Sequence, residues 1–152
     1  MVDNPATEKT VITRTTRDLD ELRSSLQRWL ASRLPAGAEP EIARLDAPDS
    51  NGMSSLTVLF DAAWTEDGAR LMHSLVARVA PEPASVPVFP SYDLDLQYRV
   101  IEGVAEASSV PVPPLLWSEP DPGPIGAPFF VMGRVEGRVP PDNMPYVFGS
   151  WV

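Results

Sequence analysis

The chain of 152 residues contains no cysteine and a single histidine, His73. Disulfide bridges, thiolate nucleophiles and cysteine-ligated metals are therefore excluded. A metal site rich in histidine is excluded as well, and so is any catalytic scheme that needs two imidazoles. We interpret His73 as a packed or surface strand residue in preference to a metal ligand.

Long apolar runs are also lacking, since none approaches the roughly 20 residues that a helix needs to cross a bilayer. The first ten residues, MVDNPATEKT, have neither the basic region nor the apolar region of a signal peptide. We therefore expect a protein without a membrane partner, located in the cytoplasm. At this length, with 43% hydrophobic and 22% charged residues, the composition is typical of one globular domain.

Basic residues are few: 12 Lys and Arg stand against 21 Asp and Glu, which gives a formal net charge of -9. Binding to a nucleic-acid backbone needs clustered Lys and Arg that displace counterions. We therefore expect no nucleic-acid partner, and any phosphate group must be bound by a local arrangement of donors.

The first half of the chain predicts a helix followed by three strands. From Asp18 to about Leu34, leucines and Trp29 recur at spacings of three and four, Glu21 completes a capping box, and proline and glycine follow. Strands are predicted over 41–45, 56–64 and 71–80, with a glycine-bearing loop before the second and a turn at 65–68. Together the three strands predict an antiparallel meander.

The second half predicts one more helix and two more strands. Residues 81–90 carry four prolines and predict a packed, extended connection. A helix is predicted over about 92–106, with Ser91 or Asp93 as its cap and Leu94, Tyr98, Ile101 and Ala105 on one face. Residues 115–119 predict a short strand, 120–128 a link rich in turns, and 129–132 a buried strand.

The order helix, three strands, helix, two strands resembles the small lobe of the protein-kinase-like fold. More closely, the sequence resembles the N-terminal lobe of aminoglycoside phosphotransferases and choline-kinase-like enzymes, whose relatives occur fused to acyl-CoA dehydrogenases. The segments that carry the resemblance are GMSS (52–55), LVAR (75–78), YDLDLQYRV (92–100), VPVP (110–113) and GAPFFVMGRVEG (126–137). The resemblance implies an α+β fold: a five-stranded antiparallel sheet with one packed helix between strands three and four, plus an N-terminal helix.

In this family the loop between the first two strands folds over the phosphates of a nucleotide. Gly52 would let the backbone N–H groups approach closely because it has no Cβ, and Met53, Ser54 and Ser55 complete the loop, the serines as extra donors. The loop departs from the G-x-G-x-x-G pattern of protein kinases, since it has one glycine where that pattern has three. Taken alone, Gly52 reads as a plain hairpin glycine.

In the predicted third strand, Arg78 lies where the protein-kinase-like fold keeps its phosphate-pairing lysine, and relatives with an arginine there exist. The resemblance implies that Arg78 binds the nucleotide phosphates and that Val76, on the same face by strand alternation, contacts the adenine. The alternative is a surface arginine with a solvated head group. Gln97 lies where the family has a glutamate, so either the nucleotide compensates the charge of Arg78 or a neighbour such as Asp93 or Glu102 does.

After the fifth strand, the segment M132-G-R-V135 resembles the hinge between two lobes. The resemblance implies that Met132 lies beside the inner edge of the adenine, while the Gly133 carbonyl and the Val135 amide bind its outer edge. Met132 can equally be an ordinary core residue, and both interpretations can hold together.

The family's catalytic loop, H-G-D-x-x-x-x-N, and its later metal-binding Asp are not found in the sequence. We therefore expect the ATP-binding small lobe of a small-molecule phosphotransferase, with Mg²⁺ ligands in a missing second lobe, no catalysis by this chain alone, and self-association through the uncovered surface. The alternative is a non-catalytic, kinase-like scaffold module. The expected division is an arm at 1–17, a helix at 18–36, the nucleotide-binding lobe at 37–135, and the hinge with the start of the second lobe at 136–152.

Overall fold

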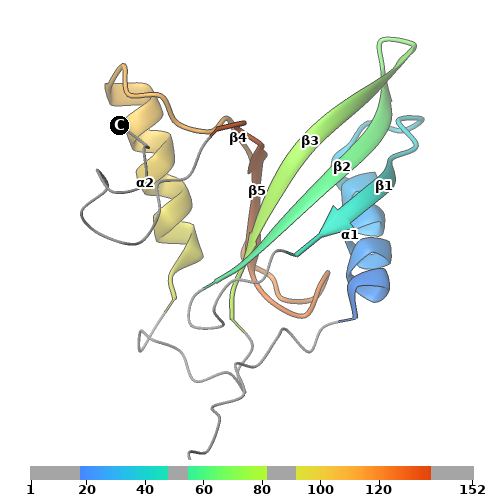
Figure 1. The fold of residues 1–152 in the computed structure, drawn as a ribbon, viewed down its shortest axis with the longest axis horizontal. Helices are drawn as coiled ribbons and strands as arrows, with labels where there is room; N and C mark the ends of the chain where they lie inside the picture. The colour runs from blue at the N-terminus through green and yellow to red at the C-terminus, as the bar shows by residue number, and fades with distance from the viewer. Residues whose placement is uncertain (1–17, 48–54, 82–91, 138–152) are drawn as a thin grey trace, which may run out of the picture.

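The computed structural model describes residues 18–47, 55–81 and 92–137 (Figure 1). It confirms an α+β fold with a five-stranded antiparallel sheet in the order β1-β2-β3-β5-β4, an arrangement consistent with a small kinase-like lobe. The elements are α1 (Leu19–Arg33), β1 (Glu41–Asp46), β2 (Leu56–Glu66), β3 (Ala69–Val79), α2 (Leu94–Ala107), β4 (Leu115–Glu119) and β5 (Phe129–Gly133).

Helix α1 begins at a polar cap and buries one apolar face. The Asp18 carboxylate accepts hydrogen bonds from the backbone N–H groups of Asp20, at 2.8 Å, and Glu21, at 3.3 Å, two donors that would otherwise lack partners at a helix start. The residues buried on the opposite side recur at helical spacing: Leu22, Leu26, Trp29 and Leu30. Each such side chain stabilises the fold by about 2 kcal/mol through burial.

The hairpin of β2 and β3 is longer than the sequence predicts at its tip. Only Asp67 and Gly68 turn the chain, with φ of 50° and 80°, and Glu66 pairs directly with Ala69. A two-residue turn with positive φ at both positions matches the twist of antiparallel strands, so the residues on either side of it stay in the ladder. The predicted turn at 65–68 contains the observed turn but is two residues too wide on the β2 side, since Thr65 and Glu66 belong to β2. Strand β3 begins at Ala69, two residues before the predicted start at 71.

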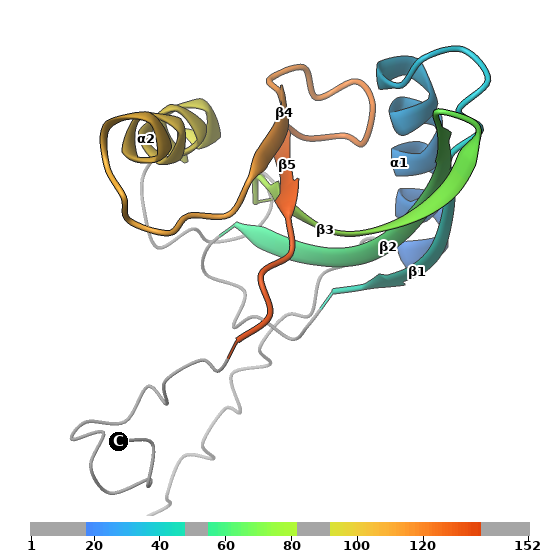
Figure 2. The ribbon, with the colours of Figure 1, turned by 90° about the horizontal axis from the view of Figure 1, so that it is seen from above.

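The two helices lie on opposite faces of the curved sheet (Figure 2). Phe129 and Phe130 are neighbours in β5 and point to opposite faces. The Phe129 ring packs on Trp29 of α1 with 4.7 Å between centroids, and the Phe130 ring packs on Tyr98 of α2 with 5.9 Å. We name the two sides of the sheet the α1 face and the α2 face.

The hydrophobic core fills the α1 face. Its buried strand residues include Val58, Phe60, Ala62 and Trp64 of β2 and Leu75, Ala77 and Val79 of β3. In contrast, Leu94 is the one buried side chain of α2 among the described residues, while Leu96 and Val100 are 50% and 56% exposed. Helix α2, which contacts β4 and β5, is therefore held with fewer buried side chains than α1.

A buried carboxylate joins α1 to β4. Glu119 accepts hydrogen bonds from the Trp29 indole N–H at 2.9 Å, from the Arg33 guanidinium and from the backbone N–H of Asp121 at 3.1 Å. The indole bond is the largest effect on the pKa of Glu119, which lies below its ordinary value although burial alone would raise it. This residue is a structural tether between sheet and helix.

Two further expectations concern the helices. The cap of α2 is Asp93, whose carboxylate accepts a hydrogen bond from the Leu96 N–H at 2.8 Å. Ser91, the other predicted cap, lies outside the described ranges. Ala105, one of the four residues on the predicted helix face, is exposed.

Within the described ranges neither helix is long and apolar enough to cross a membrane.

Candidate functional site

The α2 face carries three consecutive rows of side chains that run across β2, β3 and β5. Because Leu75, Ala77 and Val79 point into the core, Val76 and Arg78 lie on the α2 face, as strand alternation predicts. The strand register defines the rows as Thr57, Arg78 and Phe130, then Leu59, Val76 and Met132, then Asp61, Ser74 and, just beyond β5, Arg134. We call them the arginine row, the apolar row and the aspartate row.

Arg78 is half-buried, and its head group is held against β2. One terminal nitrogen donates to the Thr57 hydroxyl at 2.7 Å, and the other donates to the Ser55 hydroxyl. Burial lowers the pKa of Arg78 from its ordinary value, yet a guanidinium remains protonated at neutral pH. Among the described residues, no carboxylate lies within ion-pair distance of it. In this part of the chain Arg78 is a cation bound only to neutral oxygens.

Helix α2 does not supply a charge partner. Within the described ranges the hydrogen bonds of Arg78 go to Ser55 and Thr57, and none joins it to the half-buried Gln97. The Asp93 carboxylate caps α2 instead. Burial and, second, the charge of Glu102 raise the pKa of Tyr98. Neither acidic neighbour takes the role of the family's glutamate here.

The predicted phosphate loop is described only at its end. Gly52, Met53 and Ser54 lie outside the described residues. Ser55 is 2% exposed, and its oxygen accepts the hydrogen bond from Arg78. Among the described residues, no partner accepts a hydrogen bond from its own O–H.

The predicted adenine contacts lie in and beside the apolar row. Val76 is 7% exposed and lies directly opposite Met132 in the adjacent strand. Gly133 lies against Pro114, since its N–H donates to the Pro114 carbonyl at 2.8 Å and a Cβ there would lie 2.7 Å from Pro114 Cγ. Val135, 65% exposed, follows outside the strand. The structure thus brings Val76, Arg78 and Met132 together on one face and leaves Val135 at its margin.

Sequence reasoning missed the aspartate row. Arg134 Nη2 lies 3.2 Å from Asp61 Oδ1 and donates to the Ser74 hydroxyl at 3.0 Å, while Ser74 Oγ donates to Asp61 Oδ1 at 2.7 Å. The available signal was the presence of Asp61 and Ser74 at alternating positions within otherwise apolar strands. Their common partner lies 60 residues further along than Ser74, which no local pattern reveals.

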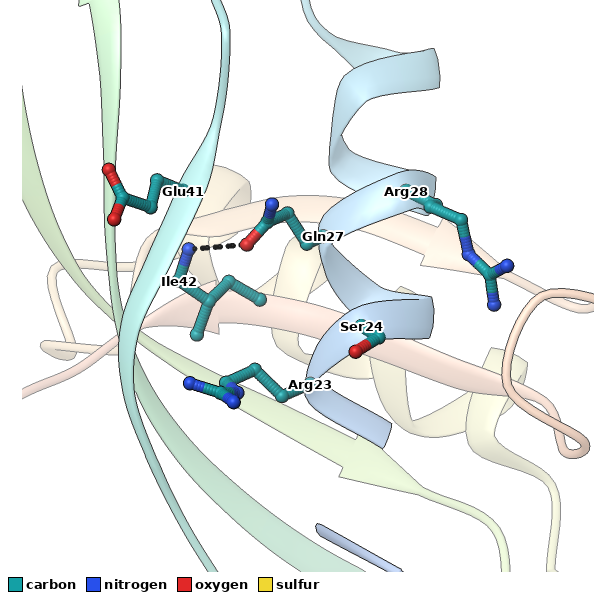
Figure 3. A pocket seen from close by; sticks show the side chains of 6 residues that line it. All are labelled: Arg23, Ser24, Gln27, Arg28, Glu41 and Ile42. Atoms are coloured by element: carbon teal, nitrogen blue, oxygen red, sulfur yellow. Dashed lines mark hydrogen bonds between the residues drawn. The ribbon is translucent and has the colours of Figure 1, made fainter. Parts of the chain in front are cut away.

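Two cavities lie elsewhere, and of the predicted nucleotide-binding residues those that the structure describes line neither. The first, of about 500 Å³, opens between α1 and β1 and is lined by Arg23, Ser24, Gln27, Arg28, Glu41 and Ile42 (Figure 3). Gln27 Oε1 accepts from the Ile42 N–H at 3.0 Å there. Both arginines have partners, Asp20 and Ser25, within α1. The second, of about 350 Å³, lies at the start of α2 beside Glu119.

His73 is a packed strand residue, in line with the interpretation above. Its ring stacks on Trp64 with 3.6 Å between centroids and 3° between planes, and its Nε2 lies 3.6 Å from Glu66 Oε1. Within the described ranges, no three His, Asp or Glu side chains gather as a metal ion would require.

No model of a known protein family matches the chain.

Proposed function

We propose that the chain is the ATP-binding small lobe of a phosphotransferase that resembles aminoglycoside phosphotransferases. The observation that carries this proposal is Arg78, a half-buried guanidinium whose described partners are all neutral. A cation in such a place is stabilised by an anionic ligand, and its planar head group suits the paired oxygens of a phosphate. The fold, consistent with a small kinase-like lobe, supports the same function.

The order of the rows fits the shape of a nucleotide. The apolar row combines Val76, which is buried, with Leu59 and Met132, which are partly exposed. A planar base could pack against the exposed parts of this row. Arg78 lies two residues further along β3, about 7 Å away, on the side toward the loop that precedes β2. A base above Val76 and Met132 would therefore extend its phosphates toward Arg78 and the Ser55 hydroxyl.

In the proposed reaction, the hydroxyl oxygen of a small-molecule substrate forms a bond to the γ-phosphorus of MgATP while the bond from that phosphorus to the β,γ-bridging oxygen breaks. MgADP leaves, and the hydroxyl proton passes to a base. The residues of this chain would bind and orient the nucleotide: Val76 and Met132 the base, Arg78 the phosphates, and the backbone of Gly133 and Val135 the outer edge of the base. The described residues form no metal-ion cluster. The residue that orients the acceptor and the Mg²⁺ ligands are expected from a second lobe.

The test is a titration with MgATP of the wild-type chain and of Arg78→Ala, in which binding is measured from NMR chemical shifts. Loss of charge-assisted hydrogen bonds worth about 1.5–3 kcal/mol predicts a rise in Kd of roughly tenfold to a hundredfold. Arg99→Ala is the matched control, because Arg99 is an exposed arginine of α2 paired with Asp95 at 2.9 Å. An unchanged Kd in Arg78→Ala would refute the assignment.

A non-catalytic scaffold module is the second candidate. Two observations favour it: Gln97 replaces the expected glutamate without bonding Arg78 within the described residues, and α2 exposes Leu96 and Val100. A scaffold would show no saturable shift change with MgATP or MgADP. The same titration therefore separates the two candidates.

A further inference from the structure

We propose that Asp61, Ser74 and Arg134 form a clamp that fixes the chain where it leaves β5 and so governs how tightly the base of a nucleotide is bound. Resting on the proposed function, the inference adds positioning residues that act on the base and not on the phosphates. The clamp belongs to the aspartate row, at the opposite side of the apolar row from Arg78.

The clamp is a set of one ion pair and two side-chain hydrogen bonds that spans three strands. Arg134 extends from the end of β5 across β3 to reach Asp61 on β2, and Ser74 of β3 bonds to both of them. The Arg134 backbone N–H donates to the Ser74 carbonyl at 2.9 Å, which continues the ladder one residue beyond β5. Both side-chain and backbone bonds therefore hold residue 134 to the sheet.

The ion pair of Arg134 with Asp61 is well protected from water. Of the other arginine pairs that the structure describes, all except Arg33 with Glu119 are more exposed. The Arg134 and Asp61 side chains are 27% and 22% exposed, whereas Arg44 and Asp46 of β1 are 72% and 50% exposed. Partial burial strengthens a charge-assisted bond, since water competes less for both groups. The guanidinium of Arg134 also binds Glu136 at 3.0 Å, so residues on both sides of Val135 are tied together.

Val135 depends on this clamp for its position. Its side chain is 65% exposed and provides little packing of its own. The residue before it is bonded to β2 and β3, and the residue after it is bonded to Arg134. The Val135 amide, the group proposed to bind the outer edge of a base, therefore lies between two residues that the bonds of Arg134 hold in place.

The experiment compares two ligands on the full chain: MgATP, which has a base, and inorganic tripolyphosphate, which has none. Asp61→Asn keeps the shape of the side chain and removes its charge. We expect the Kd for MgATP to rise by about tenfold, because one charge-assisted bond is lost, and the Kd for tripolyphosphate to stay within about twofold of the wild type. Arg78→Ala should weaken both ligands.

Amide hydrogen exchange provides a readout that needs no ligand. Exchange at Val135 and Glu136 should be faster in Asp61→Asn than in the wild type, while the exposed-pair control Arg44→Gln should leave it unchanged. Ser74→Ala, at an exposed position, is a milder second variant should Asp61→Asn unfold. It should move exchange and the Kd for MgATP in the same direction by a smaller factor.

The outcomes separate the inference from the function on which it rests. An unchanged Kd for MgATP in Asp61→Asn, an equal loss of both ligands, or unchanged exchange at Val135 would overturn the clamp alone. Failure of the wild type to bind MgATP would overturn the proposed function and the clamp's role in it, whatever the exchange rates show. A loss confined to MgATP together with faster exchange would support the clamp.

Discussion

The two faces of the sheet carry side chains from the same strands but differ in character: one is a buried apolar core, and the other includes charged residues. On the α1 face, alternate residues of β2 and β3 are apolar, buried and in contact with one helix. On the α2 face, the intervening positions include Asp61, Ser74 and Arg78, and the covering helix buries a single side chain among the described residues. Stability is thus concentrated on one face, which leaves the other free to carry charge.

The sharpest test of this contrast replaces one leucine on each helix. Leu26 of α1 is fully buried and Leu96 of α2 is 50% exposed. Leu26→Ala should lower the free energy of unfolding by about 2–5 kcal/mol through lost burial and a cavity, and Leu96→Ala by about 0.5 kcal/mol or less. Urea denaturation measures both, and similar losses would mean that α2 is anchored as firmly as α1.

A second prediction concerns the buried tether of the α1 face. The pKa of Glu119 is lowered, chiefly by the Trp29 indole bond, so the native state holds this proton less tightly than the unfolded state does. Its stabilising effect is complete above the ordinary glutamate pKa of about 4.3 and is lost as the pH falls through the lowered native value. Glu119→Gln should therefore cost about 1–3 kcal/mol of unfolding free energy at pH 7 and less at pH 3.

The control for this pH dependence is Glu136→Gln, since the Glu136 side chain is 86% exposed. That change should leave the free energy of unfolding almost unaltered at both pH values. If Glu119→Gln cost the same at pH 3 as at pH 7, the charge of Glu119 would have no part in its contribution.

The smallest expected effects come from two glycines on the α2 side. Gly133→Ala places a Cβ 2.7 Å from Pro114 Cγ and should cost about 1–2 kcal/mol through overpacking. Gly103→Ala, in the middle of α2 with no atom near the added methyl, should stabilise the protein by about 0.5–1 kcal/mol. Thermal unfolding measures the stability of both variants. A destabilising effect of Gly103→Ala would mean that neighbouring atoms crowd this position of α2.

The sequence predicted each helix and strand that the structure describes because each has a local cause: a cap at Asp18, alternation in β3, proline at the joints. It also placed Val76 and Arg78 on one face, which follows from period-two geometry. The tether at Glu119 and the clamp at Arg134 were missed because their partners lie 90 residues away, for Trp29, and 60, for Ser74. Such pairs exist only once the sheet order brings β4 to α1 and β5 to β3.

The bond between Glu119 and Trp29 has a consequence for how the chain can be shortened. A version that begins at residue 37 would keep all five strands and lose α1. Glu119 would then lose the indole and guanidinium that bind its carboxylate, and the rings of Trp117 and Phe129 would lose their contact with Trp29 of α1. The N-terminal helix is therefore as much a part of the sheet's folding unit as any strand, and we expect the shortened chain to aggregate.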